Sequence, residues 1–119
     1  MSDTDVLLST SERNGITIVR FNRSEIFDVE VAEDLEFDLK KLIQAKPGSV
    51  WVIDFTGVDV IISRVVSSLL LVLRIVRSHG GSIRLCGLGE TVERVIELAK
   101  LDRVFHVHRT LDEAIAASQ

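Results

Sequence analysis

One serine in this sequence is placed where its side chain could do chemistry. Ser63 follows the apolar run Val60–Ile62 and precedes an amphipathic stretch that we expect to be helical from about Arg64 to His79. A serine at the N-cap of a helix accepts hydrogen bonds from the free N–H groups of the first turn. A phosphate on that oxygen would be stabilised by the same N–H groups and would add a charge of about −1.5 to −2. Ser63 is therefore predicted to cap the helix and is a candidate for phosphorylation.

The helix predicted after Ser63 carries two aliphatic residues on its polar side. At about 100° per residue, Val65, Leu69, Val72 and their neighbours form a broad apolar face. Leu71 and Ile75 fall instead among the polar residues Arg64, Ser67, Ser68, Arg74 and Ser78. This arrangement is compatible equally with a docking surface and with scattered surface aliphatic residues. The residues predicted to contact a partner are Ile62, Arg64, Ser67, Leu71, Arg74 and Ile75.

The residue types that usually hold metals or attack substrates are poorly grouped. His106 and His108 alternate on a short predicted strand and have no neighbouring cysteine or carboxylate to complete a metal site. Cys86 ends an apolar strand with no adjacent base to activate its thiol. Asp54 and Asp59 flank a turn, where such side chains bond to nearby backbone. We therefore expect no metal, no cofactor and no catalytic centre.

A glycine-rich turn leaves a small-ligand site open as an alternative. Gly87-Leu-Gly89 lies between a predicted strand and a predicted helix, as in dinucleotide-binding loops. The third glycine of that pattern would stand at position 92, where the chain has Val92. A nucleotide site is thus only weakly indicated.

Composition sets the broad class of the protein. The 119 residues are 46% hydrophobic and 27% charged, so we expect one globular domain over residues 1–119. The net charge of −4 argues against nucleic-acid binding. We expect a cytoplasmic protein without membrane contact. The sequence has one cysteine and no signal-peptide pattern, and its longest apolar run, Val65–Leu73, is too short to span a membrane.

The elements that must position Ser63 alternate between strand and helix. Apolar periodicity and turn residues predict strands at Val6–Ser9, Ile16–Phe21, Val50–Phe55, Ser82–Cys86 and Val104–Val107, and helices at Glu30–Gln44, Arg64–His79, Glu90–Lys100 and after Thr110. The nearly unbroken apolar run Val50–Phe55 is typical of a central strand covered on both faces. The expected fold is α/β, a mixed sheet of four to five strands packed with about four helices.

The chain from Trp51 to its end resembles the STAS domain, a fold shared by anti-sigma factor antagonists and the tails of sulphate transporters. The matching segments are Trp51–Asp59, Ile62-Ser63, Gly80–Cys86, Val92–Ala99, Leu101–Phe105 and Leu111–Ile115. They follow one another in order and at nearly constant spacing. The resemblance implies a non-enzymatic signalling module with the STAS fold.

The resemblance also implies a role for Ser63. In the antagonist branch an Asp-Ser-Ser-Gly motif precedes this helix, and its first serine is phosphorylated by the partner kinase. Ser63 matches that serine, whereas Ile62, Arg64 and Val65 replace the other three residues. The implied partners are an anti-sigma factor with serine kinase activity and a cognate phosphatase. A non-switching scaffold in a stressosome-like assembly and a nucleotide-binding module are the alternatives, and a weak homodimer stays open.

Overall fold

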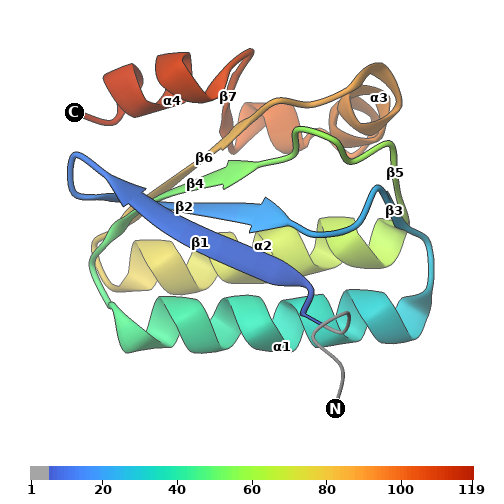
Figure 1. Ribbon diagram of the computed structural model, residues 1–119, viewed down its shortest axis with the longest axis horizontal. Coiled ribbons are helices and arrows are strands. Elements are labelled where there is room, and N and C mark those ends of the chain that lie inside the picture. The colour runs from blue at the N-terminus through green and yellow to red at the C-terminus, as the bar shows by residue number, and fades with distance from the viewer. Residues whose placement is uncertain (1–5) are drawn as a thin grey trace.

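The computed structural model describes residues 6–119 and contains a five-stranded mixed sheet (Figure 1). Its strands, in spatial order, are β1 (Leu8–Arg13), β2 (Ile16–Phe21), β4 (Val50–Asp54), β6 (Ser82–Cys86) and β7 (His106–His108). β1 and β2 form an antiparallel hairpin, and every other neighbouring pair is parallel. The predicted mixed sheet is confirmed.

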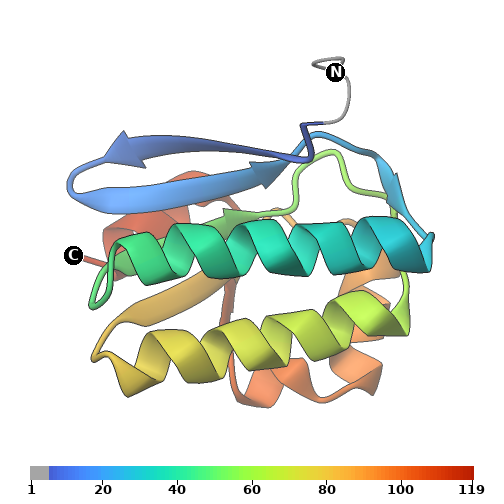
Figure 2. The ribbon, with the colours of Figure 1, turned by 90° about the horizontal axis from the view of Figure 1, so that it is seen from below.

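Four helices pack on this sheet. They are α1 (Val29–Ala45), α2 (Ser63–Ser78), α3 (Glu90–Leu98) and α4 (Leu111–Ala117). α1 and α2 run side by side in the same direction below the sheet, and α4 lies above it (Figures 1 and 2). No helix in residues 6–119 combines the length and apolar character needed to cross a bilayer.

The central strand β4 separates two apolar layers, as its sequence predicts. Trp51 and Ile53 point into the main core with α1 and α2, and Val52 points to a smaller core under α4. All three are at most 2% exposed. Because β4 is covered on both faces, it provides a rigid base for the loop that leads to Ser63.

The first hairpin turns more tightly than the sequence suggested. Asn14 and Gly15 both adopt positive φ, 55° and 80°, as a two-residue hairpin turn requires. The strand predicted at Val6–Ser9 therefore runs on to Arg13, which pairs with Ile16. Its residues from Ser9 onward are exposed. An exposed polar edge strand has no alternating pattern, and this is why its extent was predicted wrongly.

The chain after α3 also differs from the prediction. α3 ends at Leu98 because Lys100 turns into the left-handed conformation at φ 60°. Leu101–Arg103 then forms a 3₁₀ turn, and the N–H of Phe105 bonds back to the carbonyl of Leu101 at 2.8 Å. The strand predicted at Val104–Val107 consequently begins only at His106. The predicted cap of α4 is confirmed, since Thr110 Oγ1 accepts a hydrogen bond from the N–H of Glu113.

A two-stranded sheet that the sequence did not reveal joins the starts of α1 and α2. β3 (Glu25–Ile26) pairs in parallel with β5 (Val60–Ile61). The N–H of Ile62 continues the pairing by donating to the carbonyl of Ile26 at 3.1 Å. Strands of two residues are too short to show a hydrophobic period. Their pairing holds the N-terminal ends of the two helices next to each other (Figure 1).

Candidate functional site

Ser63 is the first residue of α2 rather than its cap. Ile62 occupies the N-cap position with extended backbone, φ −101° and ψ 167°, and no side chain accepts from the first turn. The hydrogen bond from Ile62 to Ile26 fixes this extended conformation, so the helix begins one residue earlier than predicted. The predicted N-cap role of Ser63 is therefore wrong. Its side chain is exposed at the positive end of a 16-residue helix.

The first turn of α2 is open to an anion. It carries no acidic residue, and its N–H groups receive no side-chain cap. Helix N-termini attract negative charge through these N–H groups and through the helix dipole. A phosphate on Ser63 would meet both, so the geometry suits phosphorylation better than it suits a structural cap.

Arg64 forms an ion pair inside the protein instead of pointing freely outward. Its Nη1 lies 2.7 Å from Glu36 Oε1 on α1. The hydroxyl of Ser68 donates to the same carboxylate oxygen at 2.8 Å, and Ser68 is only 3% exposed. The Arg64 guanidinium and the Ser68 hydroxyl hold the pKa of Glu36 below its ordinary value, against the opposing effect of burial. These three residues link α1 to α2 directly behind Ser63.

The predicted docking stripe of α2 divides between two sides of the helix. Leu71 and Ile75 follow Arg64 at seven and eleven residues, on the side that contacts α1, and both are half-buried. The expectation that they face solvent is wrong, because a wheel of one helix does not show where a second helix packs. Ser67 and Arg74 are exposed on the outer side together with Ser63.

Two exposed apolar residues beside Ser63 escaped the sequence analysis. Phe27 follows β3 directly and is 63% exposed, and Val29 opens α1 and is 54% exposed. Phe27 directly follows Ile26, whose carbonyl accepts from the N–H of Ile62, and Val29 stands two residues farther on. The available signal was an aromatic residue outside the periodic core positions of the following helix. Ser63, Ile62, Phe27 and Val29 together form the candidate site.

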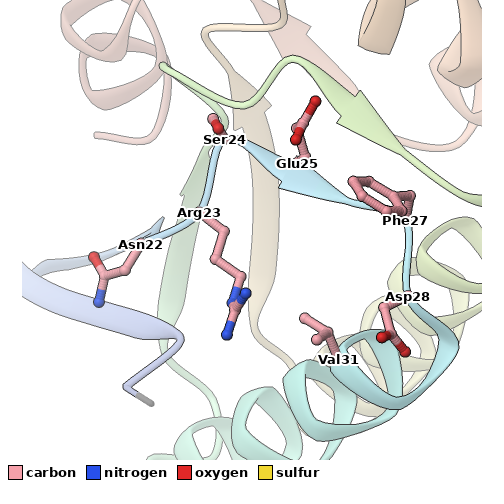
Figure 3. A pocket seen from close by; sticks show the side chains of 7 residues that line it. All are labelled: Asn22, Arg23, Ser24, Glu25, Phe27, Asp28 and Val31. Carbon is pink, nitrogen blue, oxygen red and sulfur yellow. The ribbon is translucent and has the colours of Figure 1, made fainter. Parts of the chain in front are cut away.

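A shallow depression of about 470 Å³ lies on the other side of Phe27 (Figure 3). It is lined by Asn22, Arg23, Ser24, Glu25, Phe27, Asp28 and Val31. In Figure 3 the Arg23 side chain extends toward Val31, whereas Glu25 points away from it. Two carboxylates accompany the single cation, and none of the polar lining residues is buried. The depression therefore extends the apolar edge of the candidate site without forming an enclosed ligand cavity.

The glycine-rich turn after β6 is explained by packing. A Cβ at Gly87 would come within 2.7 Å of Asp54 Oδ1 and would collide with Thr56. Asp54 is buried, accepts from the N–H and the hydroxyl of Thr56, and pairs with Arg20 at 3.1 Å. This arrangement agrees with the turn role predicted for Asp54. The close approach at Gly87 accounts for that glycine without a bound nucleotide.

The remaining candidate groups have structural surroundings. Burial, followed by the nearby Asp54 carboxylate, raises the pKa of Cys86 to about 12, so its thiol stays protonated at neutral pH. His108 Nε2 lies 3.0 Å from Arg84 Nη1, and burial together with this cation lowers the pKa of His108. Within residues 6–119 there is no cluster of three His, Cys, Asp or Glu side chains able to hold a metal ion.

Comparison with known proteins agrees with this architecture. The sequence profile of the STAS domain matches residues 8–114. The structure is similar to that of an anti-sigma factor antagonist from Mycobacterium paratuberculosis, with 24% identity, a TM-score of 0.82, and coverage of 99% of this chain and 98% of that one. It is also similar to an anti-sigma-factor antagonist (STAS) domain protein from Planctomyces limnophilus, with 19% identity, a TM-score of 0.84, and coverage of 94% and 97%.

A phosphorylated protein is among the similar structures. The Bacillus cell fate determinant SpoIIAA in its phosphorylated form shares 18% identity with this chain and has a TM-score of 0.69. The match covers 94% of this chain and 99% of that one. At these identities the likeness establishes the fold, while the profile match extends over most of the sequence.

Proposed function

The chain belongs to the STAS domain family, and on that premise we propose that it is a regulatory module of the anti-sigma factor antagonist type, switched by phosphorylation of Ser63. It acts as a single cytoplasmic domain that binds and releases a protein partner rather than catalysing a reaction. The observation that carries the proposal is the exposed Ser63 at the uncapped start of α2, beside the exposed Phe27 and Val29. Similar folds belong to proteins described as anti-sigma factor antagonists.

A phosphate on Ser63 has opposite effects on the stability of the fold and on the binding of a partner. Within the fold, the added charge meets the open N–H groups of α2 and is tolerated. At the interface, the same charge lies next to apolar residues that a partner must cover, and a charge buried without a counter-ion opposes binding. Phosphorylation therefore releases the partner, and removal of the phosphate by a phosphatase restores binding.

The partner that fits this cycle is an anti-sigma factor with serine kinase activity. Its contact surface on this chain includes Ile62, Ser63, Ser67 and Arg74, which lie at the start of α2 and along its outer side. Arg64 is held by Glu36 and contributes to the shape of the site from within. Leu71 and Ile75 lie at the half-buried edge of this contact surface, on the side of α2 that faces α1.

Isothermal titration calorimetry with the cognate kinase tests the proposal. Ser63→Asp should weaken binding by about 1–3 kcal/mol, the scale of a charge placed badly in an interface. Ser63→Ala should keep binding but abolish phosphate incorporation by the kinase. Ser11→Asp is the matched control, since Ser11 is an exposed serine on β1 and lies outside this contact surface. Equal affinity of wild type and Ser63→Asp would instead support the non-switching scaffold.

A further inference from the structure

The exposed side of α1 and the segment before it concentrate negative charge. Between Arg23 and Lys40 the chain has seven of its 18 acidic residues and no lysine or arginine. They are Glu25, Asp28, Glu30, Glu33, Asp34, Glu36 and Asp38. Five of them are exposed, Asp38 is half-buried, and the half-buried Glu36 is the one paired with Arg64. Solvent-facing charge of one sign on this scale sets up a strong local field.

Large apolar side chains are exposed inside the same segment. Phe27, Val29 and Phe37 are 63%, 54% and 61% exposed, and they are half of the six large hydrophobic residues found exposed in residues 6–119. Val29, Glu33 and Phe37 follow at steps of four, so they form one row along α1. We define the acidic ridge as Phe27, Val29 and Phe37 with the acidic residues around them.

The chain itself shows what kind of group Phe37 attracts. Lys41 Nζ lies over the Phe37 ring, 5.4 Å from its centroid. An aromatic face attracts cations, and the carboxylates of Glu33 and Asp34, four and three residues before Phe37, add to that attraction. Nucleic acids and anionic lipid surfaces are repelled by the same field. Charge complementarity thus favours one class of occupant.

We propose that the acidic ridge docks a protein segment that carries basic residues around apolar side chains, supplied by the partner that meets Ser63. This inference rests on the proposed function, because it takes that partner to be the occupant. The β3–β5 pairing places the ridge beside the start of α2, so one partner covers both. Apolar anchors hold the segment in place, and the surrounding carboxylates select its charge and speed its approach.

The test uses the full chain and a defined probe. The probe is an 18-residue amphipathic helical peptide of leucine and lysine, and its control has glutamate in place of lysine. In ¹⁵N–¹H spectra the lysine peptide should shift amides between Phe27 and Asp38, and the glutamate peptide should not. Phe37→Ala should weaken binding about tenfold, the scale of losing one anchor. Leu98→Ala is the matched control, because Leu98 is 78% exposed on α3.

Charge variants supply the second arm of the test. Glu30→Lys with Asp34→Lys should abolish binding of the lysine peptide, whereas Glu90→Lys with Glu93→Lys, at the start of α3, should not. The inference is overturned by shifts centred away from α1, by equal effects of the two charge pairs, or by binding of phosphatidylglycerol vesicles or duplex DNA at Phe37. If the wild-type chain self-associates and Phe37→Ala does not, the occupant of the acidic ridge is a second copy of this chain and the inference is overturned. The Ser63→Asp measurement with the kinase is independent, so either idea can fail alone.

Discussion

The starts of α1 and α2 lie side by side but are built in opposite ways. The first turn of α1 is capped by Asp28, whose carboxylate accepts from the N–H of Glu30 at 2.8 Å. The first turn of α2 has no side-chain cap and carries the cation Arg64. One helix end is completed by its own sequence, and the other is left for an added charge. The first turn of α2 therefore keeps free N–H groups that a negative charge on Ser63 would stabilise.

The link between the two helices should show the largest effect on stability. Glu36→Ala leaves Arg64 and the buried Ser68 hydroxyl without their shared acceptor, which should lower the free energy of unfolding by about 1–2 kcal/mol. We expect a small loss for a charged hydrogen-bond partner, because Arg64 is one-third exposed and solvent screens its ion pair with Glu36. Urea unfolding measures it. Glu12→Ala, which removes an exposed ion pair with Lys46, should leave the free energy of unfolding nearly unchanged.

The same link should depend on pH. The pKa of Glu36 is lowered in the folded state from 4.5, so the unfolded chain takes up this proton first as the pH falls. The stabilisation is fully present above about 4.5 and is lost as the pH falls through the folded pKa. The stability difference between wild type and Glu36→Gln should therefore shrink in acid. A difference that stays constant would show that Arg64 does not act through the carboxylate charge.

The caps themselves provide the most direct contrast between the helices. Asp28→Ala should destabilise the protein by about 1 kcal/mol, since it removes a cap that is present. Ser63→Ala should change stability by less than about 0.5 kcal/mol, since Ser63 accepts no cap hydrogen bond. Thermal unfolding of both variants at one pH decides the matter. Equal losses would mean that Ser63 caps α2 in solution.

The smallest expected effect has the opposite sign. Ser63→Asp places a negative charge in the first turn of α2 and should raise the free energy of unfolding by about 0.3–1 kcal/mol at low salt. The gain should fade with added salt, because such charges are screened. The same substitution is expected to weaken the kinase complex. Destabilisation by Ser63→Asp would contradict the open N-terminus described above.

Sequence periodicity predicted the parts of the molecule that one element determines alone. The central strand β4 and the helices near Glu30 and Arg64 follow from local apolar patterns. The environments of Ser68 and Leu71 do not, since both depend on α1 packing against α2. Whether a helical position faces solvent is a property of the pair of helices.

The candidate site was predicted in part. Ser63 could be located from sequence because its position before an apolar helix is a local feature. The one-residue error in the helix start, and the missed Phe27 and Val29, share a physical cause. All three depend on the pairing of Ile26 with Ile61, a contact between segments far apart in the chain that leaves no local pattern.

The polar edge strand β1 has a consequence for handling the protein at high concentration. An unpaired strand edge is a template for addition of further strands and so for aggregation. In β1 the residues from Ser9 to Arg13 are exposed and polar, and its last two residues are held in ion pairs, Glu12 with Lys46 and Arg13 with Asp112. These polar and ion-paired residues disfavour pairing of β1 with a strand of another molecule. Replacing Thr10 and Glu12 with valine should remove that protection and promote fibril formation.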